Sequence, residues 1–334
     1  MQEKIHNLKL NIYGVNIECQ SHSFELISLL SKDFQYFKTE KALKNPYLYQ
    51  FYIHPPPFER LSNLSVDKHS ANSMTTDQGN IRYNNYYGKA LSVYDLKEES
   101  CQVFSENFNI LHELSYLIIL SRSGKKLETQ GMHKVHAFGV SKSGKAIIGM
   151  MPMKGGKTTT FLELLKYKDL DILSDDTPIV NAKGYLLPFP LRIGIESNAE
   201  KPKGDKSKIY SIERSHYGKK ILFPIDYFEN QVSGVCSDAI LIDCKRWYNS
   251  DCALIKVKKY QMISPLVKNM LVGVGLPLII EYFLELTIKD FFKLSFIFIK
   301  RLSSMSRLLL RSKCYRIYLG NNPKKNAQLI YSLL

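Results

Sequence analysis

The stretch from Lys145 to Leu165, KAIIGMMPMKGGKTTTFLELL, decides the fold of this chain. Its first part, Ile147 to Met150, is a short apolar run typical of a buried strand. A loop ending in two glycines follows, and the segment from Lys157 onwards carries apolar residues at helical spacing. We therefore predict strand, loop and helix in succession, and we expect Phe161, Leu164 and Leu165 to lie in the core.

A strand, a glycine-containing loop and a helix in this order suit the binding of a phosphate tail. The first N–H groups of a helix point at a bound anion, glycines let the backbone approach it, and a lysine neutralises its charge. A threonine hydroxyl after the lysine can bind Mg²⁺. The residues predicted to bind the phosphates are Gly155, Gly156, Lys157, Thr158 and Thr159, and Thr158 is also a predicted metal ligand.

The loop departs from the full phosphate-binding motif at its start. Residue 151 is methionine where the motif has glycine, and Pro152 has no N–H to donate. Two interpretations therefore stay open, an active kinase site and a site that binds nucleotide without turnover.

A second motif follows about twenty residues later. Leu170 to Ser174 has the pattern of a buried strand, which we expect to be a parallel strand, and Asp175-Asp176 follows directly. In phosphoryl transfer one carboxylate holds Mg²⁺ while another accepts the proton of the attacking hydroxyl. The alternative is an ordinary turn before Pro178, but the two motifs together favour a metal site at Asp175 and Asp176.

Three features stand in a fixed order along this part of the chain. They are the strand Val135-His136-Ala137, the hairpin leading to Gly155-Gly156-Lys157-Thr158, and Leu173-Ser174-Asp175-Asp176. In this order and spacing they resemble the HPr kinase family and its wider relatives, which include phosphoenolpyruvate carboxykinases and kinases that tailor lasso-peptide precursors. The segment Leu187 to Arg192 also resembles one found in HPr-kinase-related proteins of unassigned substrate.

The resemblance implies an α/β fold with an HPr kinase/phosphoenolpyruvate carboxykinase-like P-loop core. It also implies a kinase that uses ATP and Mg²⁺ to phosphorylate a hydroxyl, by expectation a serine, of a peptide or protein. Lys157 would contact the β and γ phosphates, Thr158 would bind Mg²⁺, and Asp175 and Asp176 would share the base and metal roles.

Two further catalytic residues follow from the resemblance. His136 would orient a phosphoryl oxygen, with an ordinary strand histidine as the alternative. Arg192 would stabilise charge on the transferred group, with a surface arginine as the alternative.

The remaining pattern suggests two domains. Strand-like and helical runs over residues 1–104 predict a small N-terminal α+β domain, and residues 105–334 are assigned to the nucleotide-binding domain with a basic helical C-terminal part. Within the second domain we expect a helix from Phe108 to Leu120 and a strand from Val135 to Val140. The lysine-rich stretch from Ser197 to Lys220 is expected to form a mobile surface loop.

Composition bounds the class of protein. With 45% apolar and 23% charged residues among 334, the chain can bury a sizeable core. Its 18 Gly, 13 Pro and 6 scattered Cys exclude collagen-like and disulfide-scaffold classes and favour reduced thiols. The polar start shows no signal-peptide pattern, and Leu278 to Ile299 carries too many charges for a membrane span, so a cytoplasmic location is expected.

Charge is concentrated towards the C-terminus. The chain has 46 Lys+Arg and 31 Asp+Glu, a net charge of +15, and residues 256–334 hold 14 basic and 3 acidic residues, or 14 − 3 = +11. This balance allows weak contact with an anionic membrane. Because no nucleic-acid-reading motif is present, a specific nucleic-acid partner is not expected. Oligomer formation is left open.

Overall fold

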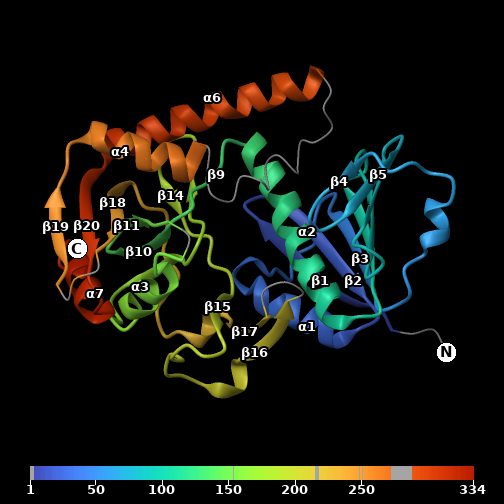
Figure 1. Cartoon of the computed structure of the whole chain (residues 1–334), viewed down its shortest axis with the longest axis horizontal. Coiled ribbons are helices and arrows are strands. Elements are labelled where there is room, and N and C mark those ends of the chain that lie inside the picture. Colours follow the sequence, from blue (N-terminus) through green and yellow to red (C-terminus); the bar gives the residue numbers. More distant parts are fainter. Residues whose placement is uncertain (1–3, 153, 215–217, 248, 250, 272–287) are drawn as a thin grey trace. The chain divides into compact units, whose positions relative to one another are not determined.

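The computed structural model describes residues 4–152, 154–214, 218–247, 249, 251–271 and 288–334 (Figure 1). The chain is a mixed α/β protein that divides into two compact units. Unit 1 comprises residues up to Ser123 together with Gly194–Ala199 and Ser207–Ile225. Unit 2 comprises Gly124–Ile193, Glu200–Lys206 and Asp226–Leu334. The first unit thus continues past the predicted boundary at residue 104 and gains two later segments.

Unit 1 is built on an eight-stranded mixed sheet in the order β1-β2-β3-β8-β7-β6-β5-β4. Its first two strands form a hairpin in which Leu8, Leu10 and Ile12 alternate into the core. The elements of this sheet and its helices are β1 (His6–Ile12), β2 (Val15–Ser21), α1 (Phe24–Asp33), η1 (Gln35–Phe37), β3 (Tyr47–Tyr52), η2 (Phe58–Leu61), β4 (Lys68–His69), β5 (Met74–Gln78), β6 (Ile81–Asn85), β7 (Leu91–Asp95), β8 (Ser100–Phe104) and α2 (Phe108–Thr129).

The prediction of a mobile surface loop from Ser197 to Lys220 is wrong for the second half of that stretch. There the chain forms a hairpin of β16 (Tyr210–Arg214) and β17 (Gly218–Phe223), and β17 also pairs with β15 (Ile193–Glu196). Ile212 and Ile221 are buried although lysines surround them in the sequence. The short helix η3 (Lys206–Lys208) precedes this hairpin, and η4 (Ile225–Tyr227) follows it.

Unit 2 is built on a six-stranded sheet in the order β12-β10-β11-β18-β20-β19, with a small sheet β14-β13-β9 beside it. Strands β11, β18 and β20 run parallel, whereas β10, β12 and β19 pair antiparallel with their neighbours. The strands are β9 (His133–Lys134), β10 (Phe138–Lys142), β11 (Lys145–Met150), β12 (Asp171–Ser174), β13 (Ile179–Val180), β14 (Leu186–Leu187), β18 (Asp238–Arg246), β19 (Ala253–Lys256) and β20 (Lys313–Leu319).

Helices cover both faces of the six-stranded sheet (Figure 1). Helices α3 (Lys157–Leu164) and α7 (Pro323–Tyr331) pack together on one face. Helices α4 (Lys259–Leu266) and α6 (Ile288–Arg311), joined through the π-helical turn η5 (Val267–Leu271) and residues outside the description, lie on the other. The core between the sheet and α4 and α6 contains Ile148, Met150, Leu241, Met262 and Leu308.

The hairpin before the phosphate-binding motif forms as the sequence predicts. Ser143 and Gly144 have φ of 50° and 78°, the two positive angles of a type I′ turn, and this turn pairs β10 with β11. Gly149 is required on β11 because a Cβ there would lie 2.0 Å from the ring of Phe138. The expected helix core is also confirmed, since Phe161, Leu164 and Leu165 are at most 3% exposed.

Other predicted bounds change. The helix predicted from Phe108 to Leu120 continues to Thr129 as α2. The single strand predicted from Val135 to Val140 is divided, because the N–H of His136 donates to the carbonyl of Asn269 and that of Ala137 to Asp176, outside any ladder. The segment from Leu278 lies outside the described residues up to position 287, and no described helix is long and apolar enough to cross a membrane.

Candidate phosphate-binding site

The loop between β11 and α3 turns twice before the helix begins. The N–H of Gly155 donates to the carbonyl of Pro152 at 3.0 Å, and a Cβ on Gly155 would lie 2.8 Å from that same oxygen. Gly156 is the N-cap residue with φ of +92°, a left-handed conformation that favours glycine. Both glycines are thus needed to start α3 at Lys157, with its first N–H groups facing out of the helix end.

The acidic pair is fixed at the end of β12 by hydrogen bonds on two sides. The Ser174 hydroxyl accepts from the backbone N–H groups of Asp176 at 3.3 Å and Thr177 at 2.9 Å. The carbonyl of Asp176 accepts from Ala137 at 2.9 Å. Strand β12 pairs antiparallel with β10, which is itself antiparallel to β11, so β12 runs in the same direction as β11 although the two are not direct neighbours. Its end therefore brings Asp175 and Asp176 next to α3.

The two motifs meet through their side chains. The Lys157 ammonium donates to Oδ1 of Asp176 and lies 3.3 Å from each ring nitrogen of His136, whose Nδ1 is also 3.3 Å from that oxygen. One residue along the helix, Oγ1 of Thr158 donates to Oδ2 of Asp175 at 3.1 Å. The structure therefore gathers five of the predicted site residues into one cluster, here called the Lys157–Asp176 cluster: His136, Lys157, Thr158, Asp175 and Asp176.

Burial and charge set the protonation states within this cluster. Burial would raise the pKa of Asp176, but the ammonium of Lys157 and then His136 favour the carboxylate, so the net pKa is lowered. Burial and the Lys157 charge lower the pKa of His136, against an opposing effect of Asp176. At neutral pH the cluster therefore holds an ionised aspartate and a neutral histidine. Asp176 stays accessible, with 54% of its side chain exposed.

Two predicted residues fall outside these contacts. Thr159 is exposed in the first turn of α3, where its position agrees with a phosphate contact. Arg192 is 9% exposed just before β15, so the alternative of a surface arginine is wrong. Its role in transfer stays a prediction.

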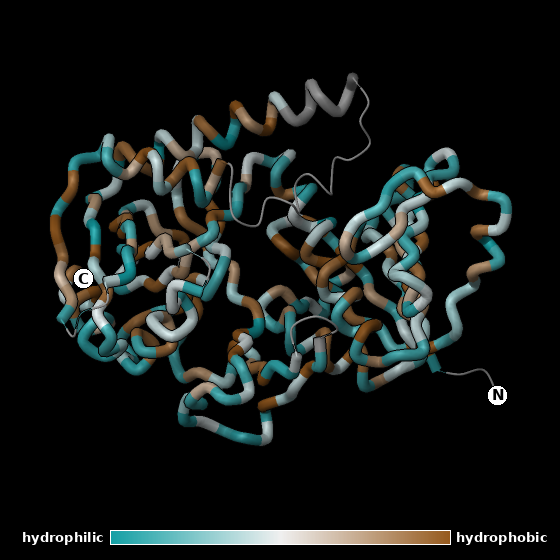
Figure 2. Tube along the Cα trace, in the orientation of Figure 1, coloured by the Kyte–Doolittle hydropathy of each residue, from teal (hydrophilic) through white to brown (hydrophobic). Residues whose placement is uncertain are grey.

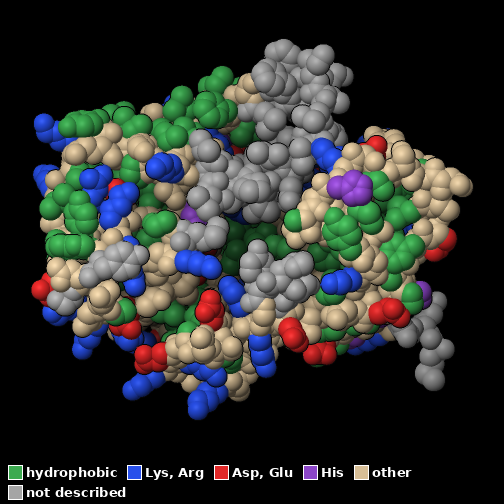
Figure 3. All heavy atoms as spheres, in the orientation of Figure 1, with side chains coloured by type: hydrophobic (Ala, Val, Ile, Leu, Met, Phe, Trp, Pro, Cys, Tyr) green, Lys and Arg blue, Asp and Glu red, His purple; other side chains and the backbone are tan. Residues whose placement is uncertain are grey.

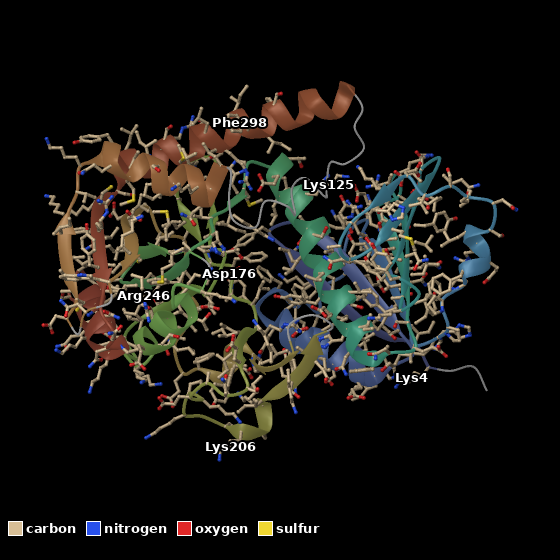
Figure 4. All side chains as sticks on the ribbon, viewed as in Figure 1. Lys4, Lys125, Asp176, Lys206, Arg246 and Phe298 are labelled. Carbon is tan, nitrogen blue, oxygen red and sulfur yellow. The ribbon has the colours of Figure 1, made fainter. Side chains whose placement is uncertain are left out.

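Sequence reasoning missed two basic residues near the cluster. Lys134 lies two residues before His136, with its ammonium 4.6 Å from the centre of the Phe189 ring, and burial lowers its pKa to about 8 despite the opposing charges of Glu128 and Asp176. Arg246, at the end of β18, has Nη1 3.6 Å from the position that a Cβ of Gly156 would occupy (Figure 4).

Neither residue carries a local sequence signal. Strand β18 runs parallel to β11, with Asp243 opposite Met150, so both strands end at the same edge of the sheet. Ligands of open α/β sheets bind at the carboxyl ends of the strands, where Arg246 and the loop meet.

The donor set fits a hard divalent cation held in part by phosphate. Among the described residues there is no cluster of three or more His, Cys, Asp or Glu side chains. Mg²⁺ needs fewer protein ligands than such a cluster supplies, because it keeps waters and takes oxygens from a bound phosphate. The hydroxyl of Thr158 and the carboxylate of Asp175, in contact with each other, are oxygen ligands of that kind. All six cysteines are free thiols, five of them buried.

No family model matches the chain, and no curated protein is significantly similar to it.

Proposed function

We propose that this chain is a Mg-ATP-dependent kinase with an HPr-kinase-like P-loop core, which transfers phosphate to a hydroxyl, expected to be serine, of a peptide or protein. One observation carries the proposal. Lys157 and Thr158 open α3, and each contacts one of two adjacent aspartates, Asp176 and Asp175. The first turn of α3 and the end of β12 thus bring four groups together. They are a cation for phosphate, a hydroxyl and a carboxylate for Mg²⁺, and an exposed carboxylate for an acceptor.

The residues present fit both ATP and Mg²⁺. Gly156 begins α3 in a left-handed conformation without a side-chain cap, and the first N–H groups of the helix suit phosphate oxygens. Thr158 and Asp175 would hold the metal, which when bound neutralises charge on the β and γ phosphates. Arg246, beside Gly156 on the opposite side of the loop from β12, supplies a second cation for the phosphates.

Asp176 is the residue that would face the acceptor hydroxyl. Its exposed, ionised carboxylate can accept the hydroxyl proton as the oxygen attacks phosphorus. Without nucleotide the carboxylate is occupied by the Lys157 ammonium. A triphosphate competes for the same ammonium, so its binding would leave Asp176 more basic and more available to the acceptor. Neutral His136 lies between the two groups and can donate a hydrogen bond to a phosphoryl oxygen.

A second candidate function is a regulatory or scaffold protein that binds ATP without turnover. The observation in its favour is the start of the loop, where Met151 is 2% exposed in the core and Pro152 has no N–H. One backbone donor of an ordinary phosphate-binding loop is therefore missing at Pro152, and Met151 has a side chain where the motif has glycine, which weakens the cradle around the transferred phosphate.

Transfer from γ-labelled ATP to a serine-containing peptide library separates the two candidates. With Mg²⁺ the full chain should label peptides, and Asp176→Asn should lose transfer while it still binds ATP. Binding of ATP by the wild type without any labelling or phosphate release would favour the regulatory protein. A folded wild type that does not bind ATP would contradict both.

A further inference from the structure

Helix α6 is apolar on two opposite sides. Its inner side chains Ile297, Met305 and Leu308 are at most 4% exposed and pack on the core. Its outer side carries five large apolar side chains that are 42–70% exposed, here called the α6 outer surface: Phe296, Phe298, Ile299, Leu302 and Leu310. The apolar face of an amphipathic helix is normally covered by a neighbour. The α6 outer surface therefore points to a partner.

The apolar surface extends beyond this helix. Figure 2 shows hydrophobic residues recurring along α6, and Figure 3 shows hydrophobic side chains gathered over α4 and α6. On α4, Tyr260 is 65% and Ile263 45% exposed, and the ammonium of Lys259 donates to the carbonyl of Leu310. Phe298 points away from the sheet (Figure 4). Contiguous exposed patches of this kind mark interaction sites in folded proteins.

The charge on and after α6 is mostly positive, although Asp290 near the start of the helix is acidic. Residues 291–334 contain nine Lys and Arg and no Asp or Glu. On α6, Lys300 donates to the carbonyl of Thr129 and Arg307 to that of Ala182, while Arg311 lies 4.9 Å from the centre of the Tyr185 ring. Arg301, in contrast, forms an ion pair with the carboxylate of Glu128. Because the partners of Lys300, Arg307 and Arg311 are carbonyls and a ring, these three residues keep their full positive charge.

We propose that α6 docks this chain on an anionic membrane surface, with the α6 outer surface inserted at the lipid interface and the neighbouring Lys and Arg on lipid phosphates. Apolar side chains bordered by basic ones are the composition of helices that lie in the membrane interface. Docking of a second copy would bring two basic surfaces together, which repels. The helix would lie along the bilayer surface, because its inner side chains Ile297, Met305 and Leu308 are packed on the core of the protein.

Flotation of the full chain with lipid vesicles tests the proposal. We expect binding to vesicles of phosphatidylglycerol and phosphatidylcholine, and little to phosphatidylcholine alone. Raising salt from about 0.1 M to about 1 M should weaken it, because the screening length falls from about 10 Å to about 3 Å. Phe298→Ser/Ile299→Ser/Leu302→Ser should reduce vesicle affinity at least about tenfold, because each removes apolar area from the interface.

Matched variants separate docking from unfolding and from the nucleotide site. The three replaced side chains are exposed, so the variant should keep the melting temperature of the wild type. Val235→Ser, which changes a 58% exposed side chain elsewhere in unit 2, should bind vesicles like the wild type. Arg311→Gln should weaken binding about fivefold, because one basic residue near an anionic surface contributes about 1 kcal/mol. Lys157→Ala should bind unchanged, so vesicle binding does not depend on the proposed kinase activity.

Four outcomes would overturn the proposal. They are no vesicle binding by the wild type, equal binding to neutral and anionic vesicles, unchanged binding of the triple variant, and a vesicle-free dimer that the triple variant abolishes.

Discussion

Replacing Lys157 with alanine should weaken nucleotide binding strongly and leave the fold intact. Lys157 is 13% exposed and its ammonium sits against Asp176 and His136, so packing alone would suggest a structural role. Its partner Asp176 is 54% exposed, however, and water can take over that carboxylate when the lysine is removed. The ion pair is therefore worth only about 0 to 1 kcal/mol of folding free energy.

The cost to nucleotide binding is larger, because water can donate a hydrogen bond to phosphate but does not supply the positive charge of the ammonium. A hydrogen bond to a charged group contributes about 1.5 to 3 kcal/mol, which corresponds to an ATP affinity about 10 to 150 times weaker in Lys157→Ala. Isothermal titration with Mg-ATP measures the affinity, and thermal melting of the free protein measures the stability.

A matched control comes from the other end of the same helix. Lys166 forms an exposed ion pair with Glu163, so Lys166→Ala removes one charge without reaching the loop and should keep its ATP affinity. Equal losses of affinity in both variants would show that net charge alone attracts the nucleotide. A melting temperature that falls by many degrees in Lys157→Ala, with ATP affinity unchanged, would refute the assignment of Lys157 to the phosphates.

Three further variants test the surroundings of the cluster. The pKa of His136 is lowered in the fold, so its contribution to stability is present above the unfolded value of about 6.5 and is lost as pH falls through it. His136→Gln should therefore show a smaller loss of melting temperature between pH 7 and pH 5 than the wild type, and an equal loss would contradict the shift. The pKa of Lys134 is about 8 in the fold and about 10.4 in the unfolded chain, so the charged lysine lowers the stability of the fold at neutral pH. Lys134→Met should raise the melting temperature at pH 7 by an amount that shrinks towards pH 10, and a constant difference would show that packing is responsible. Arg246→Ala should weaken ATP binding about tenfold, the effect of one lost charged hydrogen bond, with no change in melting temperature, and unchanged affinity would place Arg246 away from the phosphates.

The sequence predicts those parts of the fold that depend on residues close to one another in the chain. The turn at Ser143-Gly144 and the apolar run of β11 fix the hairpin, and the glycine pair and helical spacing fix the start of α3. The contact between Lys157 and the acidic pair also followed from sequence, because a lysine at a helix start and two adjacent carboxylates, found together, are typical of a phosphate and metal site.

The parts that sequence does not predict depend on which strands become neighbours. The sequence of Asp171–Ser174 does not indicate whether its partner is the antiparallel β10 or a parallel strand, because a buried strand has an apolar sequence with either kind of neighbour. Arg246 is ninety residues from Gly156 and reaches it only because β18 pairs with β11. The hairpin of β16 and β17 is difficult to recognise in the sequence, because Lys219 and Lys220 directly precede buried Ile221.

The most direct test of the account is the effect of Mg²⁺ on ATP affinity in the wild type and in Asp175→Asn. Thr158 and Asp175 are in contact at 3.1 Å beside the predicted phosphate position, so Mg²⁺ should tighten ATP binding by the wild type at least about tenfold, the effect of one charged oxygen ligand. Asp175→Asn should lose most of that gain and retain binding of ATP without metal. A wild type that binds ATP equally with and without Mg²⁺, or a variant that keeps the full gain, would contradict a metal-assisted phosphate site at the start of α3.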